Sequence, residues 1–385
     1  MAKTYRHFSP LIIGLTRLLF KNKKRGAGGH SDNHSPEVRK DRKMKALCFY
    51  QHGGLDVLRY DDVADPTPAR GQVLVEVKAC ALNHLDLWVM RGWPGLNLEM
   101  PHWGGSDISG VVAGLGEGVT GFETGRRVVI DHGINPVDDE FTLRGEHSMS
   151  PRYTIIGEHT RGGFARYVAV PAKNLVTMPD DIDFPEACAP LLVTLTAWRM
   201  LINRAKLRAQ ETVLMVGAGG GVNSVSIQIA KLAGATVYVV ASNAEKAEKA
   251  RELGADFVID RSRVDWGKEV QKLTAKRGVD LVVDNVGAAT LATSMAVAAR
   301  GGRIVIVGNT SGPQVQIDVR MIFGKQLSLI GSTMGTPKDF RDITRLIWSG
   351  KVKTVIEEVI PLSEGKRGFE MMERSEMFGK IVLVP

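Results

Sequence analysis

A glycine-rich segment in the middle of the chain has the spacing of a phosphate-binding turn. It reads Gly217-Ala218-Gly219-Gly220-Gly221-Val222-Asn223 and lies between an apolar run, 212–216, and an amphipathic run, 222–232. Where a buried strand turns into a helix, backbone N–H groups at the positive helix end can approach a pyrophosphate, and glycines leave room for it. The segment therefore predicts a dinucleotide site, with contacts from Gly217, Gly219, Gly220, Gly221 and Val222.

Asn223 departs from the usual pattern of such turns. A third glycine ordinarily lets the helix pack closely on its strand, whereas asparagine carries a Cβ atom. We expect either a helix that lies slightly farther from the strand or unusual backbone angles at Asn223, which asparagine tolerates better than most residues.

The residues after the second apolar run, 236–240, indicate which dinucleotide is bound. An acidic residue there would bond the ribose 2′-hydroxyl of NAD, but the chain continues Ala241-Ser242-Asn243-Ala244-Glu245-Lys246. Ser242 and Asn243 offer polar donors, and Lys246 follows in the next turn. Taken alone, Lys246 is equally consistent with a solvated helix residue. Together these residues favour a 2′-phosphate, and hence NADP(H) over NAD(H).

The apolar runs predict a fold of class α/β with two domains. Short strands separated by turns are expected at 45–49, 72–79, 108–114 and 127–130. Strands then alternate with helices, at 212–216, 222–232, 236–240, 244–253, 257–259, 281–283 and 303–307. Strands without polar alternation are typical of a parallel sheet covered on both faces. The predicted units are a β-rich domain, 44–175, and a Rossmann domain with a doubly wound sheet, 176–335.

The segment 336–385 is too short to form a third core, and we expect it to return to the β-rich domain. One helix, 338–348, a proline-containing stretch and a final strand, 380–385, are expected in it.

The net charge of +8 belongs to the N-terminal 43 residues, which hold 11 Lys and Arg against 3 Asp and Glu. The other residues carry 39 of each sign, so nucleic acid is not an expected partner. The apolar run 10–20 is shorter than the ~20 residues that span a membrane. Residues 1–43 are therefore expected to be a disordered extension or upstream sequence before a start at Met44, with a mitochondrial targeting segment as the alternative. Three scattered cysteines, Cys48, Cys80 and Cys188, indicate a reducing compartment, the cytoplasm.

Four further motifs join the glycine-rich turn in a recognisable order. They are Asn83-His84-Leu85-Asp86, Gly105-Ser106-Asp107-Ile108-Ser109-Gly110-Val111, Gly162-Gly163-Phe164-Ala165 and Thr194-Leu195-Thr196-Ala197-Trp198. From about Met44 onward, the chain resembles the medium-chain dehydrogenases/reductases, in particular their zinc-free quinone oxidoreductase-like branch. The resemblance implies a GroES-like catalytic domain completed by the C-terminal strand, and an active site between it and the Rossmann domain.

The resemblance also implies further cofactor contacts. Thr196 is expected beside the nicotinamide, together with Asn285, Gly308, Asn309 and Ser332. Lys246 falls where NADPH-using relatives place a lysine for the 2′-phosphate, and Arg261 falls where several place a second contact. A guanidinium at that place suits a phosphate.

The positions that match the catalytic zinc ligands of the superfamily are Asn83, Ser106, Asp107 and Leu192. Only Asp107 has a side chain that binds zinc readily, and Leu85 replaces the hydroxyl residue of the proton relay. The segment 134–152 resembles the structural-zinc lobe but contains no cysteine. We therefore predict no metal in either place, and we expect His132, His147 and His159 at the surface.

Without a metal, the expected acceptors are quinones or α,β-unsaturated carbonyls, which delocalise the charge that a hydride brings. Asn83 and Thr196 are the candidates for hydrogen bonds to the developing oxyanion. Trp88, Trp93 and His84 are candidates for the substrate pocket, although both tryptophans would also suit simple packing. No general acid is assigned.

Two alternatives stay open at this point: a zinc-free alcohol or aldehyde dehydrogenase, and a non-catalytic NADPH-binding protein. Relatives of this kind imply a homo-oligomer, a dimer or tetramer, that acts on a small-molecule substrate.

Overall fold

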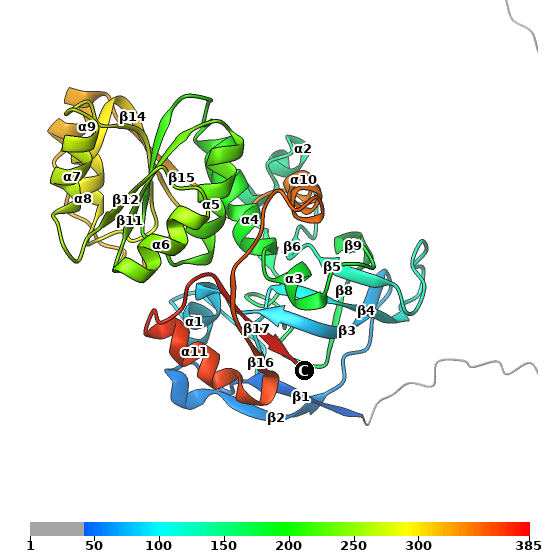
Figure 1. The fold of residues 1–385 in the computed structure, drawn as a ribbon. Coiled ribbons are helices and arrows are strands. Elements are labelled where there is room, and N and C mark those ends of the chain that lie inside the picture. Colours follow the sequence, from blue (N-terminus) through cyan, green and yellow to red (C-terminus); the bar gives the residue numbers. More distant parts are fainter. Residues whose placement is uncertain (1–41) are drawn as a thin grey trace, which may run out of the picture. The chain divides into compact units, whose positions relative to one another are not determined.

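The computed structural model describes residues 42–385 (Figure 1). The predicted extension, 1–43, lies outside the described residues except for Arg42 and Lys43, and Lys43 already opens the first strand. Within the described part, no helix is long and apolar enough to cross a membrane.

The first part of the chain and its last segment form the GroES-like domain. Its strands are β1 (Lys43–Cys48), β2 (Arg59–Ala64), β3 (Gln72–Ala81), β4 (Asp107–Leu115), β5 (Arg127–Ile130), β6 (Gly133–Ile134), β7 (Thr154–Ile155), β8 (Tyr167–Pro171), β9 (Leu175–Thr177), β16 (Ile356–Pro361) and β17 (Lys380–Val384). Its helices are α1 (His84–Arg91), α2 (Glu140–Leu143), α3 (Phe184–Cys188), α10 (Pro337–Trp348) and α11 (Gly365–Glu373). The main sheet has the order β16-β17-β3-β4-β5-β9, with β8 also paired to β3.

The Rossmann domain has six parallel strands in the order β12-β11-β10-β13-β14-β15. They are β10 (Thr212–Val216), β11 (Thr236–Ala241), β12 (Phe257–Asp260), β13 (Val279–Asp284), β14 (Ala298–Ile306) and β15 (Ser328–Gly331). The helices are α4 (Leu191–Trp198), α5 (Gly221–Leu232), α6 (Ala244–Glu252), α7 (Trp266–Leu273), α8 (Leu291–Val297) and α9 (Val319–Lys325). This order, which reverses direction at β10, is that of a doubly wound dinucleotide-binding sheet, so the predicted fold class is confirmed.

Two separate apolar cores cover the faces of this sheet. Residues from α4, α5 and α6 pack on one face, and residues from α7, α8 and α9 pack on the other (Figure 1). The inner strands β10, β11 and β13 are buried on both sides, as the uninterrupted apolar runs predict, whereas the edge strands β12 and β15 are largely exposed or half-buried.

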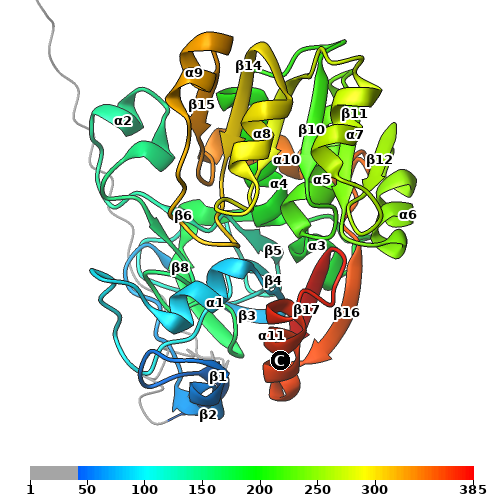
Figure 2. The same ribbon diagram turned by 90° about the vertical axis from the view of Figure 1, so that its left-hand side faces the viewer.

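The C-terminal segment contains more helices and strands than its sequence predicts. Besides α10 and the final strand, it contains β16 and α11, which were not predicted. A Cβ atom at Gly368 of α11 would lie 2.8 Å from a side-chain carbon of Leu82, so glycine allows this helix to pack closely on the sheet. The last strand, β17, pairs antiparallel with β3, with Val382 opposite Ala81 (Figure 2).

Candidate active site

The glycine-rich turn has the backbone of a phosphate-binding loop. Gly217 follows β10 with a φ angle of +100°, which side chains rarely allow, and its N–H donates to the carbonyl of Val240 at 3.0 Å. No heavy atom lies within 4 Å of a Cβ atom built on Gly220. The first turn of α5 therefore presents backbone N–H groups next to open space, as an anionic group requires.

Asn223 is helical and does not take the unusual backbone angles that we considered. Its amide nitrogen donates to the carbonyls of Val216 and Gly217, at 3.1 and 2.8 Å. Its Oδ1 accepts a hydrogen bond of 3.0 Å from Asn285, which follows β13. The side chain thus replaces close backbone packing with hydrogen bonds that join the ends of two neighbouring strands.

The other predicted cofactor residues lie along the same carboxyl edge of the sheet. The Cβ position of Gly308 is 3.2 Å from the carbonyl of Asn285, and Asn309 approaches the turn after Asn285. The N–H of Ser332 donates to the carbonyl of Ile306 at the end of β14. Because the carboxyl ends of parallel strands meet at one edge, this arrangement suits an extended dinucleotide.

Lys246 lies over the glycine-rich turn. Its Nζ is 3.1 Å from the Cβ position of Gly219 and donates to the carbonyl of Ser375 at 2.8 Å. Burial lowers the pKa of Lys246, and the neighbouring charge of Arg261 adds to this effect. Ser242 and Arg261 are exposed at the ends of β11 and β12. These three side chains form a polar, cationic corner beside the turn.

Asn83 stands at the entrance to α1, and its backbone N–H donates to Asp86 at 2.7 Å. The second carboxylate oxygen of Asp86 accepts from the backbone of Gly105 at 3.0 Å. Asp86 therefore ties the start of α1 to the loop before β4, and this brings Asn83 close to Asp107. Burial raises the pKa of Asp86 to about 7.

A buried triad lies at the meeting point of these elements. The Nζ of Lys380, the first residue of β17, donates to Asn83 Oδ1 at 2.5 Å and to Asp107 Oδ2 at 2.9 Å. Asn83 Nδ2 also donates to Asp107 Oδ2 at 2.9 Å. Asp107 and Lys380 are 0% and 1% exposed. Lys380 was not singled out in the sequence, where its one signal is a charge at the start of an otherwise apolar strand.

Comparisons with known proteins agree with this geometry. Residues 69–180 match the family model of the alcohol dehydrogenase GroES-like domain, and residues 221–349 match that of zinc-binding dehydrogenases. An NAD-dependent alcohol dehydrogenase of Saccharolobus solfataricus is 31% identical, over 89% of this chain and 100% of its own length. The chain belongs to the medium-chain dehydrogenase/reductase superfamily. It is accordingly an NAD(P)H-dependent oxidoreductase.

The chain is also similar to a quinone oxidoreductase and to a further alcohol dehydrogenase. Human quinone oxidoreductase is 26% identical, over 89% of this chain and 98% of its own. Among solved structures, an NAD-dependent alcohol dehydrogenase is 41% identical with a TM-score of 0.85, and the match covers 89% of this chain and 100% of that one.

The zinc ion that the superfamily implies does not fit the side chains of this member. Of the four matching positions, only Asp107 offers a good ligand, and its carboxylate already accepts from Asn83, Lys380 and, at 2.6 Å, the backbone of Leu192. Within residues 42–385, no group of three or more His, Cys, Asp and Glu side chains is placed to hold a metal. The ammonium group of Lys380 lies against the carboxylate of Asp107, where a metal ion would have to bind.

The lobe at 134–152 is held together by hydrogen bonds. Asp139 accepts from the N–H groups of Phe141 and Thr142, at 2.9 and 3.0 Å, and from the hydroxyl of Ser150 at 2.5 Å. Glu146 forms an ion pair with the buried Arg199 that follows α4. Capping and ion pairing therefore stabilise this segment.

The predicted substrate residues divide into two groups. His84 and Trp88 lie one turn apart on α1 with their rings edge to face, 5.2 Å between centroids, and burial lowers the pKa of His84. Thr196 is almost fully buried on α4, one helical turn beyond Leu192. By contrast, Trp93 is 40% exposed in the loop after α1.

A small apolar cluster lies around the positions that differ from the zinc enzymes. It contains Leu192, Leu85, Tyr153, Ile155 and Met334. The Tyr153 hydroxyl is buried without a hydrogen-bond partner in the described residues. Tyr153 was not predicted, because nothing in the sequence separates it from an ordinary packed tyrosine.

The expectation that all three histidines lie at the surface is wrong for His132. This residue is fully buried, and both ring nitrogens lack a hydrogen-bond partner within the described chain. Burial lowers its pKa to about 4. His132 lies in the core because it follows the apolar strand β5 closely. A single histidine in the sequence gives no sign of this burial.

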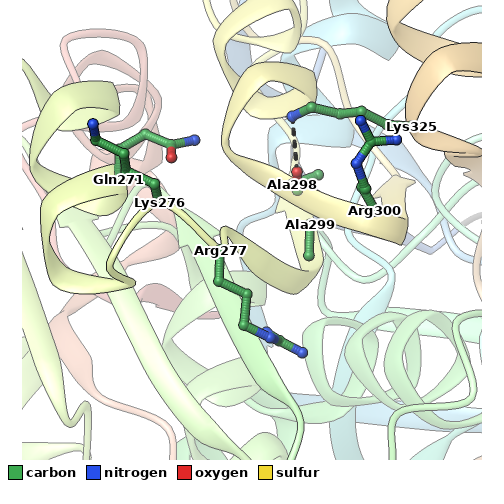
Figure 3. Close-up of a pocket in the computed structure, with 7 residues that line it drawn as sticks. All are labelled: Gln271, Lys276, Arg277, Ala298, Ala299, Arg300 and Lys325. Carbon is green, nitrogen blue, oxygen red and sulfur yellow. Dashed lines mark hydrogen bonds between the residues drawn. The ribbon is translucent and has the colours of Figure 1, made fainter.

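A surface pocket of about 430 Å³ lies elsewhere, at the amino ends of β13 and β14 (Figure 3). Its lining includes the cationic side chains of Lys276, Arg277, Arg300 and Lys325. Lys325 donates to three backbone carbonyls there, including that of Ala298 at 2.9 Å. The glycine-rich turn is at the opposite edge of the sheet, so this pocket is separate from the candidate active site.

Proposed function

We propose that the protein transfers a hydride from NADPH to a quinone or an α,β-unsaturated carbonyl without a metal ion. The observation that carries this proposal is the Lys380–Asp107–Asn83 triad, which engages the carboxylate among the four positions that match zinc ligands. The name of human quinone oxidoreductase supports this substrate class. So does that of acryloyl-coenzyme A reductase of Metallosphaera sedula, 31% identical over 88% of this chain and 99% of its own.

Conjugated acceptors suit a site that contains no Lewis acid. A bound nicotinamide would supply a hydride, and conjugation would let the displaced electron pair move to the carbonyl or quinone oxygen of the acceptor. The second amide hydrogen of Asn83 makes only a long hydrogen bond of 3.5 Å, to the carbonyl of Ala81, which a stronger acceptor can replace. This hydrogen and the hydroxyl of Thr196 are the donors that we assign to the oxyanion. His84 and Trp88 form one wall against the flat acceptor.

Preference for NADPH is part of the same proposal. The end of β11 has no acid to bond a ribose 2′-hydroxyl, and Ser242, Lys246 and Arg261 offer donors and positive charge there. A phosphate would gain charge-assisted hydrogen bonds from this corner.

The decisive experiment combines turnover with metal analysis. Purified protein is assayed with NADPH and NADH against quinones, enones, aldehydes and alcohols, while zinc is measured in the same preparation. We expect turnover of NADPH with the conjugated acceptors and zinc well below one ion per chain. Stoichiometric zinc would refute the metal-free mechanism, and tight NADPH binding without turnover would indicate a non-catalytic protein.

A second candidate is a zinc-free alcohol or aldehyde dehydrogenase. The names of several relatives favour it, including the Saccharolobus enzyme. Faster reduction of NADP⁺ with simple alcohols than oxidation of NADPH with enones would establish this alternative.

We also propose that the enzyme is a homo-oligomer, either a dimer or a tetramer. The strand β15 is an open edge of the Rossmann sheet, and Val319 and Phe323 of the adjacent α9 are 61% and 70% exposed. An unpaired edge beside exposed apolar side chains is typical of an interface. Sedimentation of wild type and Phe323→Glu tests this: the variant should dissociate.

The buried, unpaired cysteines Cys48, Cys80 and Cys188 are consistent with our proposed cytoplasmic location.

A further inference from the structure

Lys380 is among the most deeply buried side chains of the described chain, although it carries a charge. Lysine is almost never fully buried unless it is paired, because water must be removed from the ammonium group. Its partners are Asn83 and Asp107, two of the positions that match zinc ligands elsewhere in the superfamily. If the reaction needed no charge at this place, apolar residues of similar volume would stabilise the fold as well as this buried ion pair does, or better.

The triad fixes the orientation of the Asn83 amide without ambiguity. A lysine ammonium only donates hydrogen bonds, and an ionised aspartate only accepts them. Asn83 must therefore turn its oxygen to Lys380 and its nitrogen to Asp107. Its second N–H makes only a long hydrogen bond of 3.5 Å, to the carbonyl of Ala81, which a stronger acceptor can replace. The positive charge of Lys380 next to the amide oxygen also draws electron density from the amide nitrogen and strengthens the second N–H as a donor.

We propose that Lys380 is a positioning residue, which holds and polarises Asn83 for the oxyanion and so takes over the electrostatic task of a metal. This inference rests on the proposed function. In the step concerned, hydride adds to the β-carbon of an enone, the C=C electron pair moves to form an enolate, and the enolate oxygen accepts a hydrogen bond from the second N–H of Asn83 in place of the carbonyl of Ala81. Water then supplies the proton to the α-carbon, and the net reaction consumes NADPH, the enone and one proton.

The backbone around Lys380 links this task to the cofactor site. The N–H of Gly379 donates to the carbonyl of Gly219 in the glycine-rich turn at 2.9 Å. The side chain of Lys380 packs below the same turn, with its Cδ 2.9 Å from the Cβ position of Gly221. The segment around Lys380, which orients Asn83, therefore contacts the loop that we assign to the pyrophosphate directly.

The test must separate this role from simple neutralisation of Asp107. Lys380→Met alone leaves a buried carboxylate unpaired and is expected to unfold at a lower temperature. The double variant Lys380→Met/Asp107→Asn removes both charges at similar volume, so its melting temperature should return close to that of wild type. We expect its kcat with an enone to stay about 30-fold below wild type, less than the roughly 100- to 1,000-fold loss that follows complete removal of one oxyanion donor, because Asn83 is weakened and not removed. Its KM for NADPH should change less than about threefold, since both charges act on the acceptor.

The matched control is Lys231→Met/Asp256→Asn, which removes an ion pair of 2.8 Å at the far end of α5, and its kcat should equal that of wild type. A triad double variant with the kcat of wild type would overturn the proposal, because Lys380 would then only compensate for Asp107.

A second readout does not depend on turnover. 4-Nitrophenolate carries an oxyanion on a flat ring, and its absorbance reports its ionisation. In the presence of NADP⁺ it should bind the triad double variant about tenfold more weakly than wild type. Equal affinity would overturn the role of Lys380 even if no acceptor were reduced, whereas weaker binding without turnover would refute only the proposed function.

Discussion

The side-chain amide of Asn223 donates to the carbonyl of Gly217 at 2.8 Å, across the turn that we assign to the pyrophosphate. Asn223→Ala removes this bond and the bond to Val216, and it leaves Asn285 without its acceptor. We expect a loss of about 1–3 kcal/mol in the free energy of unfolding, the usual effect of leaving buried polar groups unpaired, together with a raised KM for NADPH. Chemical denaturation and initial rates measure both. Ser226→Ala, whose hydroxyl bonds only within α5, is the control, and an equal effect there would remove Asn223 from the site.

Lys246→Glu should raise the KM for NADPH far more than that for NADH. The substitution places a negative charge beside the position assigned to the 2′-phosphate, whereas NADH has only a hydroxyl there. Steady-state kinetics with both cofactors give the comparison. Lys268→Glu, on the exposed face of α7, should change neither value. Similar increases for both cofactors in Lys246→Glu would contradict the assignment.

Removal of metals should leave the enzyme unchanged. Dialysis against EDTA or 1,10-phenanthroline is expected to alter neither kcat nor the melting temperature, because no described group of side chains is placed to bind zinc. Activity that falls on dialysis and returns with added zinc would refute the metal-free site.

Asp131 should make the enzyme less stable as the pH rises through neutrality. Burial raises the pKa of Asp131 to about 7, so the folded protein holds a proton that the unfolded chain loses near pH 4. The stabilisation by this proton is present below about pH 4 and is lost as the pH rises through about 7. Asp131→Asn cannot ionise, and its melting temperature relative to wild type should increase from pH 5 to pH 8. A difference that is constant with pH would show that Asp131 titrates normally.

Gly379→Ala should damage both stability and cofactor binding. Gly379 has a φ of +96°, and an added Cβ would lie 2.1 Å from the carbonyl oxygen of Val355. We expect a loss of more than about 2 kcal/mol and a higher KM for NADPH, since Gly379 also bonds the glycine-rich turn. Gly324→Ala, with nothing within 4 Å, should be neutral or slightly stabilising. Thermal unfolding of the two variants compares them directly.

The first part of the Rossmann half could be predicted closely, because each signal there is local. The strand Thr212–Val216 and the helix after it follow directly from the apolar periodicity and the glycine cluster. Later in this half, the helices α7, α8 and α9 and the edge strand β15 were not predicted. In the C-terminal segment, the missed elements β16 and α11 owe their stability to packing on distant strands. Gly365 and Gly368, which weaken a helix in isolation, are needed in α11 for that packing.

The site shows the same division. The glycine-rich turn and Lys246 could be found from spacing, whereas the partners of Asn83 could not. Asn83 and Lys380 are 297 residues apart in sequence, and only the pairing of β17 with β3 brings them together. The reason that Asn223 suits a place usually held by glycine also depends on a tertiary contact, with Asn285.

The position of β17 has a consequence for synthesis of the enzyme. This strand lies between β16 and β3 in the sheet order, so the GroES-like sheet cannot close until the residues of β17 have left the ribosome. The Rossmann strands, by contrast, are contiguous in the chain and can pair earlier. During translation, the cofactor domain should therefore be complete while the edge of β3 still waits for its partner, and that interval is when the nascent chain most needs protection by chaperones.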